Sequence, residues 1–152
     1  MFVKLKLLSN IKSSIAIKFA ALDSYINANG GESDAIKHAS AAIVHIQAYY
    51  CHASLGSKIQ IDSGSQLAIL RGGNSIVASD NGITALNDIT RQIITNTNAD
   101  LVAYLVADPT GSRGTIGIAY LSSACNECNE CKSSVNEYDP SVARFGFVSE
   151  IF

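Results

Sequence analysis

Three cysteines within seven residues, in the stretch CNECNEC, are the side chains of this sequence whose type and spacing best suit chemistry. Cys125, Cys128 and Cys131 have the C-x-x-C-x-x-C spacing of thiolate ligands in bacterial ferredoxins. The cysteine and proline that complete that pattern do not follow here, so Cys51 would have to supply the fourth ligand. A metal or iron–sulfur site on this run is therefore one hypothesis.

The favoured interpretation of the same cysteines is that they form disulfide bonds that constrain the loop. Glu127 and Glu130 would add negative charge beside an anionic thiolate cluster, which disfavours a metal site. All four cysteines are disulfide candidates, namely Cys51, Cys125, Cys128 and Cys131. Their pairing does not follow from sequence: local pairing, pairing with Cys51 and pairing with a partner beyond this chain all stay open.

The histidines do not form a metal-binding pattern. His38, His45 and His52 are seven residues apart on an expected helix. Two helical turns separate such side chains by about 10 Å, which is too far for one ion. We expect them at the helix surface or edge. The sequence also contains no nucleophile elbow and no phosphate-binding loop, so residue chemistry alone predicts no active site.

Composition is that of one globular domain spanning residues 1–152. The formal net charge is −2 and no run of like charges occurs, so we expect no nucleic-acid partner. No apolar run approaches the roughly 20 residues that cross a bilayer, so we expect no membrane segment. Lysines interrupt the first 18 residues, and no signal peptide is visible.

Alternating helix and strand patterns predict an α/β domain. The first half reads as a strand over 15–21, a turn over 26–33 with Ser33 or Asp34 as a helix cap, a helix over 34–52 and a strand over 57–62. The second half reads as a helix capped by Ser79, Asp80 or Asn81 and ending at 97, then strands over 101–108, 114–121 and 134–137, and a helical start after Pro140. The continuous apolar run at 101–108 is typical of a strand buried on both faces.

Three segments together resemble the ADAM/reprolysin-type zinc metalloendopeptidases, which are adamalysin-like metzincins. GTIGIAYLSSAC is similar to a family strand that reads approximately G-T-x-G-x-A-Y-x-x-x-x-C. YYCHASLGSKIQI resembles the end of the family's first helix and its second strand, and SSVNEYDP resembles its short fifth strand. The matches come in the family's order and cover roughly residues 15–140.

The resemblance implies a three-layer α/β fold with two main helices and a mostly parallel twisted sheet that ends in one antiparallel edge strand. The strand at 114–121 would be that edge, forming the upper rim of a cleft in which an extended peptide or protein substrate pairs with it. Gly117, Ile118, Ala119 and Tyr120 would contact the substrate.

The family's zinc motif, H-E-x-x-H-x-x-G-x-x-H, does not occur in the sequence. Ser149-Glu150-Ile151 falls close to where that motif would begin, which makes Glu150 only a weak positional candidate and, without a metal, a surface carboxylate. The chain is therefore expected to be the upper subdomain of such a domain, without the lower one. Zinc is a cofactor of the full-length family, and none is expected in this chain.

Three functions follow as hypotheses. The first is a fragment or degenerate form of a zinc metalloendopeptidase, inactive in peptide-bond hydrolysis as given. The second is a non-catalytic module that binds peptides or proteins along the edge strand. The third is the metal or iron–sulfur protein built on the cysteine run. Family resemblance implies a secreted, extracellular protein, although no signal peptide is visible.

Overall fold

The computed structural model describes residues 16–52, 60–61, 67–108, 117–120 and 127–138. Its strands are β1 (Ala16–Leu22), β2 (Gln60–Ile61), β3 (Ala68–Leu70), β4 (Leu101–Val106), β5 (Gly117–Ala119) and β6 (Ser133–Glu137). Its helices are α1 (Asp23–Ala28), α2 (Glu32–His52), α3 (Asp80–Ala85) and α4 (Asn87–Thr97), with a 3₁₀ turn, η3, at Asn129–Cys131.

The strands form one mixed sheet in the order β2-β1-β4-β6-β5. β1 pairs in parallel with both β2 and β3, which lie along successive parts of the same side of β1. β4 is parallel to β1 and β6, whereas β5 is antiparallel to β6. A mostly parallel sheet with one antiparallel edge strand was the predicted class, and it is confirmed.

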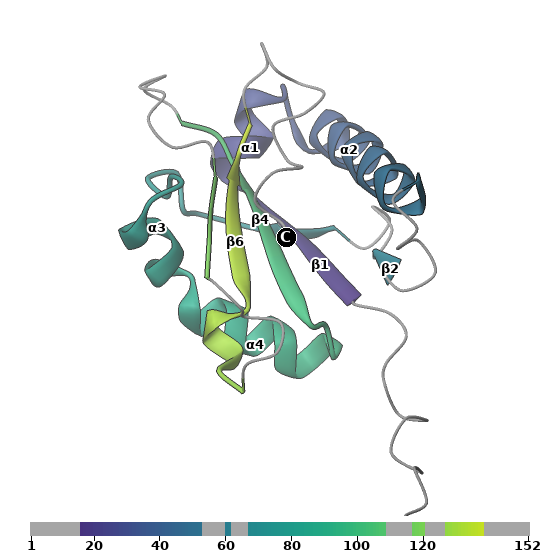
Figure 1. Cartoon of the computed structure of the whole chain (residues 1–152). Coiled ribbons are helices and arrows are strands. Elements are labelled where there is room, and N and C mark those ends of the chain that lie inside the picture. The colour runs from purple at the N-terminus through teal and green to yellow at the C-terminus, as the bar shows by residue number, and fades with distance from the viewer. Residues whose placement is uncertain (1–15, 53–59, 62–66, 109–116, 121–126, 139–152) are drawn as a thin grey trace, which may run out of the picture.

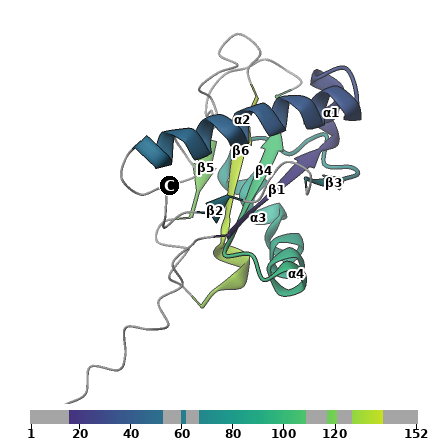
Figure 2. The same cartoon turned by 90° about the vertical axis from the view of Figure 1, so that its right-hand side faces the viewer.

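The sheet lies between two layers of helices (Figures 1 and 2). α1 and α2 cover one face, where Tyr25, Ala39 and Ile43 pack in a single cluster with residues of β1 and β4. α3 and α4 cover the other face, where Leu86 and Ile94 pack with a second set of strand residues. The result is the predicted three-layer arrangement.

β1 and β4 at the centre of the sheet contribute to both cores. In β1, Phe19 faces α1 and α2 while Leu22 faces α3 and α4. In β4, Leu105 and Tyr104 alternate in the same way, and both are at most 2% exposed. The prediction that this apolar run is a strand buried on both faces is therefore confirmed.

The segment predicted as a turn over 26–33 begins as a helix instead. α1 runs to Ala28, and the backbone N–H groups of Gly31 and Gly30 then donate to the carbonyls of Ile26 and Asn27. This pair of bonds ends α1 in a Schellman turn, which Gly30 permits through its φ of +81°. α2 follows at Glu32, so the predicted caps Ser33 and Asp34 lie inside its first turn.

The helix predicted from residue 80 to 97 is two helices. Its start is correct, because the Ser79 hydroxyl accepts a hydrogen bond from the N–H of Gly82 at 3.0 Å. Leu86 ends α3 and precedes α4, where its carbonyl accepts from Thr90. The apolar periodicity of this segment places Ile83, Leu86, Ile89, Ile93 and Thr97 on one stripe that was expected to be buried. Thr97 is exposed instead, and Thr90 and Ile94 are the buried residues of α4.

The other predicted elements match in part. β6 starts one residue before the predicted strand over 134–137. Of the strands expected over 57–62 and 114–121, the structure describes 60–61 and 117–120. The helical start predicted after Pro140 lies outside the described residues.

Candidate functional site

β5 lies at the end of the sheet, and among the described strands it pairs with β6 alone. Its register sets Gly117 opposite Asn136, Ile118 opposite Val135 and Ala119 opposite Ser134. The prediction that this strand is the antiparallel edge is confirmed. A strand in this position presents a row of backbone donors and acceptors on its outer side.

The register identifies which backbone groups point outward. The N–H of Tyr120 donates to the carbonyl of Ser133, on β6, at 3.4 Å. In an antiparallel pair these bonds recur at every second residue, so Ile118 also directs its N–H and C=O toward β6. Gly117 and Ala119 therefore direct their N–H and C=O groups away from β6, toward the outer edge.

The side chains of β5 differ between the two faces of the sheet. Ile118 and Tyr120 are half-buried and pack into the cluster under α3 and α4. Gly117 and Ala119, which alternate with them, have no side chain or a single methyl group. Gly117 is buried and Ala119 is half-buried, so Ala119 is the outward-directed position of β5 that is in part exposed.

Beside β5, the face of β6 opposite Val135 is polar although it is buried. Ser134 is 6% exposed and Asn136 is fully buried. The Asn136 amide donates to the carbonyl of Tyr104 at 3.2 Å and to the Ser134 hydroxyl at 3.0 Å. Its side-chain carbonyl oxygen has no hydrogen-bond partner among the described residues. These bonds fix β6 against β4, and β6 is the strand with which β5 pairs.

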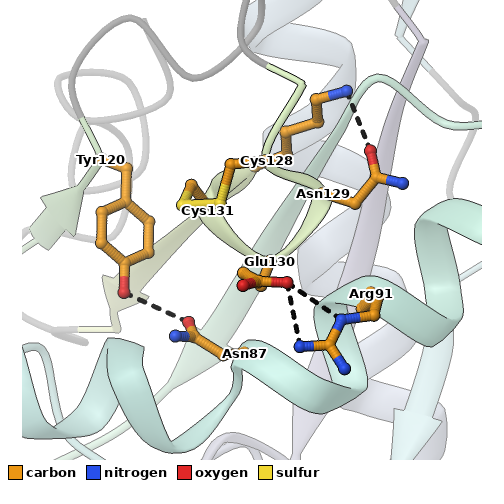
Figure 3. The surroundings of a disulfide bond; sticks show 8 residues. Asn87, Arg91, Tyr120, Cys128, Asn129, Glu130 and Cys131 are labelled. Carbon is orange, nitrogen blue, oxygen red and sulfur yellow. Dashed lines mark hydrogen bonds and ion pairs between the residues drawn. A yellow bond between two sulfur atoms is a disulfide. The ribbon is translucent and has the colours of Figure 1, made fainter.

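A polar network joins the end of β5 to α4 (Figure 3). The Tyr120 hydroxyl lies 3.1 Å from the side-chain amide of Asn87, the first residue of α4. When the side-chain nitrogen of Asn87 faces the Tyr120 hydroxyl, that nitrogen also donates to the main-chain carbonyl oxygens of Glu130 and Ile83, each at 3.2 Å. The Glu130 carboxylate in turn pairs with the guanidinium of Arg91 at 2.9 Å.

The cysteine run forms a local disulfide. Cys128 and Cys131 are bonded across η3, with their Cα atoms 5.3 Å apart. This selects local pairing for these two residues from the alternatives that the sequence left open. The Cys51 side chain and Cys125 lie outside the described part of the chain. Because both described thiols are consumed in the bond, neither is available as a metal ligand in this state.

No metal site is formed by the other predicted residues that the structure describes. His38 is exposed at the edge of α2, as expected, and its ring nitrogen bonds the side chain of Asn29. Within the described ranges, no three His, Cys, Asp or Glu side chains are grouped so as to hold a metal ion. Glu150, the weak positional candidate, lies outside those ranges.

Sequence reasoning missed the residues that anchor the edge strand. Asn87 and Arg91 were not singled out, and Glu130 was considered only as a charge near the cysteines. One signal was present, because Asn87 and Asp88 interrupt the predicted helix with residues that favour helix starts. Asn87 of α4 and Glu130 of η3 come together near Tyr120 only in the folded protein, because η3 and α4 are far apart in the sequence.

A second polar cluster joins the loop after β3 to the first residues of α1 and α2. The Asp23 carboxylate accepts from the N–H of Gly72 at 2.6 Å and lies 3.4 Å from the Arg71 guanidinium. Arg71 also pairs with Glu32 of α2. Every charge in the cluster has an internal partner, so we interpret it as a structural clamp rather than a binding site.

Comparison with known proteins supports the fold and no more specific relationship. No family model matches the chain, and no curated protein matches it. A chain in the structure of a chaperone-substrate complex is similar, with a TM-score of 0.61 and 13% sequence identity over 88% of this chain. The aligned part is 24% of that chain's length. At 13% identity, the similarity to that structure shows a shared α/β fold alone.

No described helix is long and apolar enough to cross a membrane.

Proposed function

We propose that this chain binds an extended peptide along the outer edge of β5, and that it is the upper part of an ADAM/reprolysin-type zinc metalloendopeptidase domain. The observation that carries the proposal is the position of β5 at the end of the sheet. There the backbone groups of Gly117 and Ala119 point away from β6. A peptide that adds as a further strand would bond to these groups.

The sheet supports the family part of the proposal. The resemblance implies that the strand containing Gly117–Ala119 is the antiparallel edge of a mostly parallel sheet, and β5 has that position. It also implies two main helices against a mostly parallel sheet, and α2 and α4 lie against such a sheet. The Cys128–Cys131 disulfide suits the oxidising, extracellular setting that we propose for the chain.

Zinc chemistry is not assigned to the described residues, because they do not fit the metal. Among them no group of three potential ligands comes together. The sequence also lacks the three-histidine motif by which the family holds its zinc. We therefore derive no hydrolytic step, and we propose that this chain docks peptides without cleaving them.

The principal test is an edge variant that removes one outward N–H. In Ala119→Pro the ring replaces that donor, and proline is tolerated on edge strands where the N–H faces away from the sheet. Ala119→Ser keeps the donor and is the matched control. The probe is a fluorescein-labelled hexapeptide of alternating valine and threonine, with binding followed by fluorescence polarisation.

We expect the wild type and A119S to bind the probe, and A119P to bind it at least about tenfold more weakly, with an unchanged far-UV circular dichroism spectrum. A hexapeptide N-methylated at every backbone amide has no N–H to donate from either edge and should not bind. Equal binding of both peptides, or equal binding by A119P and A119S, would refute edge-strand docking.

A peptidase assay separates a docking module from an active enzyme. The same hexapeptide with added zinc should stay intact while it binds. Turnover that a chelator abolishes would contradict the proposal that the chain does not cleave.

A further inference from the structure

We propose that the Cys128–Cys131 disulfide is a redox-sensitive element that sets the affinity of the β5 edge for an extended peptide. This inference rests on the proposed function of β5. It follows from the position of the disulfide, which closes a turn that contacts α4 directly and, through Asn87 of α4, is connected to the Tyr120 side chain at the end of β5 (Figure 3).

The bond is too local to serve as a general staple of the fold. It joins residues three apart in the sequence. Because the stabilisation that a disulfide provides through the unfolded chain increases with the length of the loop it closes, this bond adds little to global stability. Its main effect is on the shape of η3, where the N–H of Cys131 donates to the Cys128 carbonyl at 3.1 Å.

The disulfide is open to soluble reductants. Cys128 and Cys131 are both half-buried, and the neighbouring Glu127 is exposed. A thiolate must reach one sulfur atom of a disulfide in order to exchange with it. Half-buried cysteines beside an exposed residue meet that condition, whereas cysteines in the core of the sheet would not.

The turn transmits its shape to the edge strand through Glu130, which lies between the two bonded cysteines. The Glu130 carbonyl faces the Asn87 amide at 3.2 Å, and the same amide lies 3.1 Å from the hydroxyl of Tyr120. Tyr120 directly follows β5 and bonds through its N–H to β6. A change in η3 therefore alters the hydrogen bonding of the residue that anchors the end of the docking strand.

Without the disulfide, the contacts that hold the turn are weak individually. The Glu130–Arg91 pair joins side chains that are 39% and 53% exposed, so water screens it. The N–H of Lys132 donates to the Asn129 carbonyl at 3.4 Å, near the limit for a hydrogen bond. Opening the disulfide therefore lets η3 depart from the conformation in which it meets Asn87.

The switching reaction is thiol–disulfide exchange with a dithiol. A thiolate of the dithiol attacks one sulfur of the pair, the Cys128–Cys131 bond breaks, and a mixed disulfide forms. The second thiolate of the reductant then releases the remaining cysteine as its own disulfide closes. Two electrons and two protons pass from the dithiol to the two cysteines.

The oxidised form should be the tighter binder. A docking strand that is already fixed loses less conformational freedom when a peptide adds to it. In the reduced form the ordering of η3, Asn87 and Tyr120 has to accompany binding, so part of the interaction free energy is lost.

The experiment compares oxidised protein with protein reduced by dithiothreitol, using Cys51→Ser and Cys125→Ser together so that the described pair alone can exchange. With the labelled valine–threonine hexapeptide, we expect reduction to weaken binding roughly fivefold or more, the lower end of ordinary coupling between sites. The melting temperature should move little. C128S/C131S should bind like the reduced form in both conditions, and oxidised Asn87→Ala should also bind more weakly.

Hydrogen exchange gives a readout that does not depend on the peptide. On reduction, the amides of Ile118 and Tyr120 should exchange faster while those of β4 stay protected. Unchanged exchange at β5, or equal peptide affinity in the two states, would overturn the redox proposal and leave edge docking intact. Faster exchange at β5 with no peptide binding in either state would instead refute the docking function.

Discussion

The hydroxyl of Tyr104 in β4 lies 2.8 Å from the hydroxyl of Thr90 in α4, and both side chains are fully buried. Thr90 donates its own proton to the carbonyl of Leu86 at 2.9 Å. Because a threonine hydroxyl has one proton, Tyr104 must be the donor to Thr90. This pair joins the centre of the sheet to the start of α4, three residues after Asn87.

Removal of the Thr90 hydroxyl should destabilise the protein. In Thr90→Val the Tyr104 hydroxyl is left buried without a partner, which costs about 1–3 kcal/mol. Thr90→Ser keeps the hydroxyl and is the control. Urea unfolding should place T90S between the wild type and T90V, and T90V/Y104F should recover part of the loss since no orphaned hydroxyl remains.

Stability should fall at high pH through the same tyrosine. Burial raises the pKa of Tyr104 from 10.0 to about 12. The folded state then keeps a proton that the unfolded state releases. This contribution is fully present below pH 10 and is lost as the pH rises from about 10 toward about 12, by up to about 3 kcal/mol.

The control for the pH profile is Tyr104→Phe, which has no phenol to ionise. Its stability should decline less steeply above pH 10. Some decline should remain, because burial and the neighbouring Tyr138 also raise the pKa of Tyr25. Parallel profiles for the wild type and Y104F would contradict the assignment to Tyr104.

Two adjacent glycines should respond differently to alanine. Gly72 and Gly73 both have positive φ angles, +91° and +72°. A Cβ at Gly73 would lie 2.6 Å from a methyl group of the buried Leu22, whereas one at Gly72 would meet nothing within 4 Å. We expect Gly72→Ala to cost about 1 kcal/mol from the backbone conformation, and Gly73→Ala at least about 1 kcal/mol more. Thermal unfolding of the two variants measures the difference.

Asp100 should contribute to the attachment of β1 to β4. Its carboxylate accepts from the N–H of Ala16 at 2.7 Å, and its own N–H donates to the Ala16 carbonyl at 2.8 Å. Asp100→Ala removes the charged acceptor and should cost about 1–2 kcal/mol. Asp100→Asn keeps an acceptor and should cost less. An unfolding free energy of Asp100→Ala equal to that of the wild type would show that the carboxylate bond has no net value.

The sequence by itself determined the elements whose signals are local. A continuous apolar run made β4 a strand buried on both faces, because a strand in the middle of a three-layer fold has no solvent side. Three adjacent cap candidates marked the start of α3, and Ser79 is the one whose hydroxyl satisfies a backbone N–H that any helix start leaves open. The alternation of β1 and the short run of β6 were readable for the same reason. The edge position of β5 came from the family resemblance and not from its residues.

Tertiary structure alone decided the features that depend on distant partners. The break at Leu86 was not predicted because the periodicity of apolar residues continues across it. The pairing of Cys128 with Cys131 was one of several that the spacing allowed, and only a fixed turn brings these two sulfur atoms together. Asn87 and Arg91 contact Glu130 of η3, and Asn87 also contacts Tyr120, because the sheet places β5 next to β6 and packs α4 against them. No single segment of the chain contains the information for that contact.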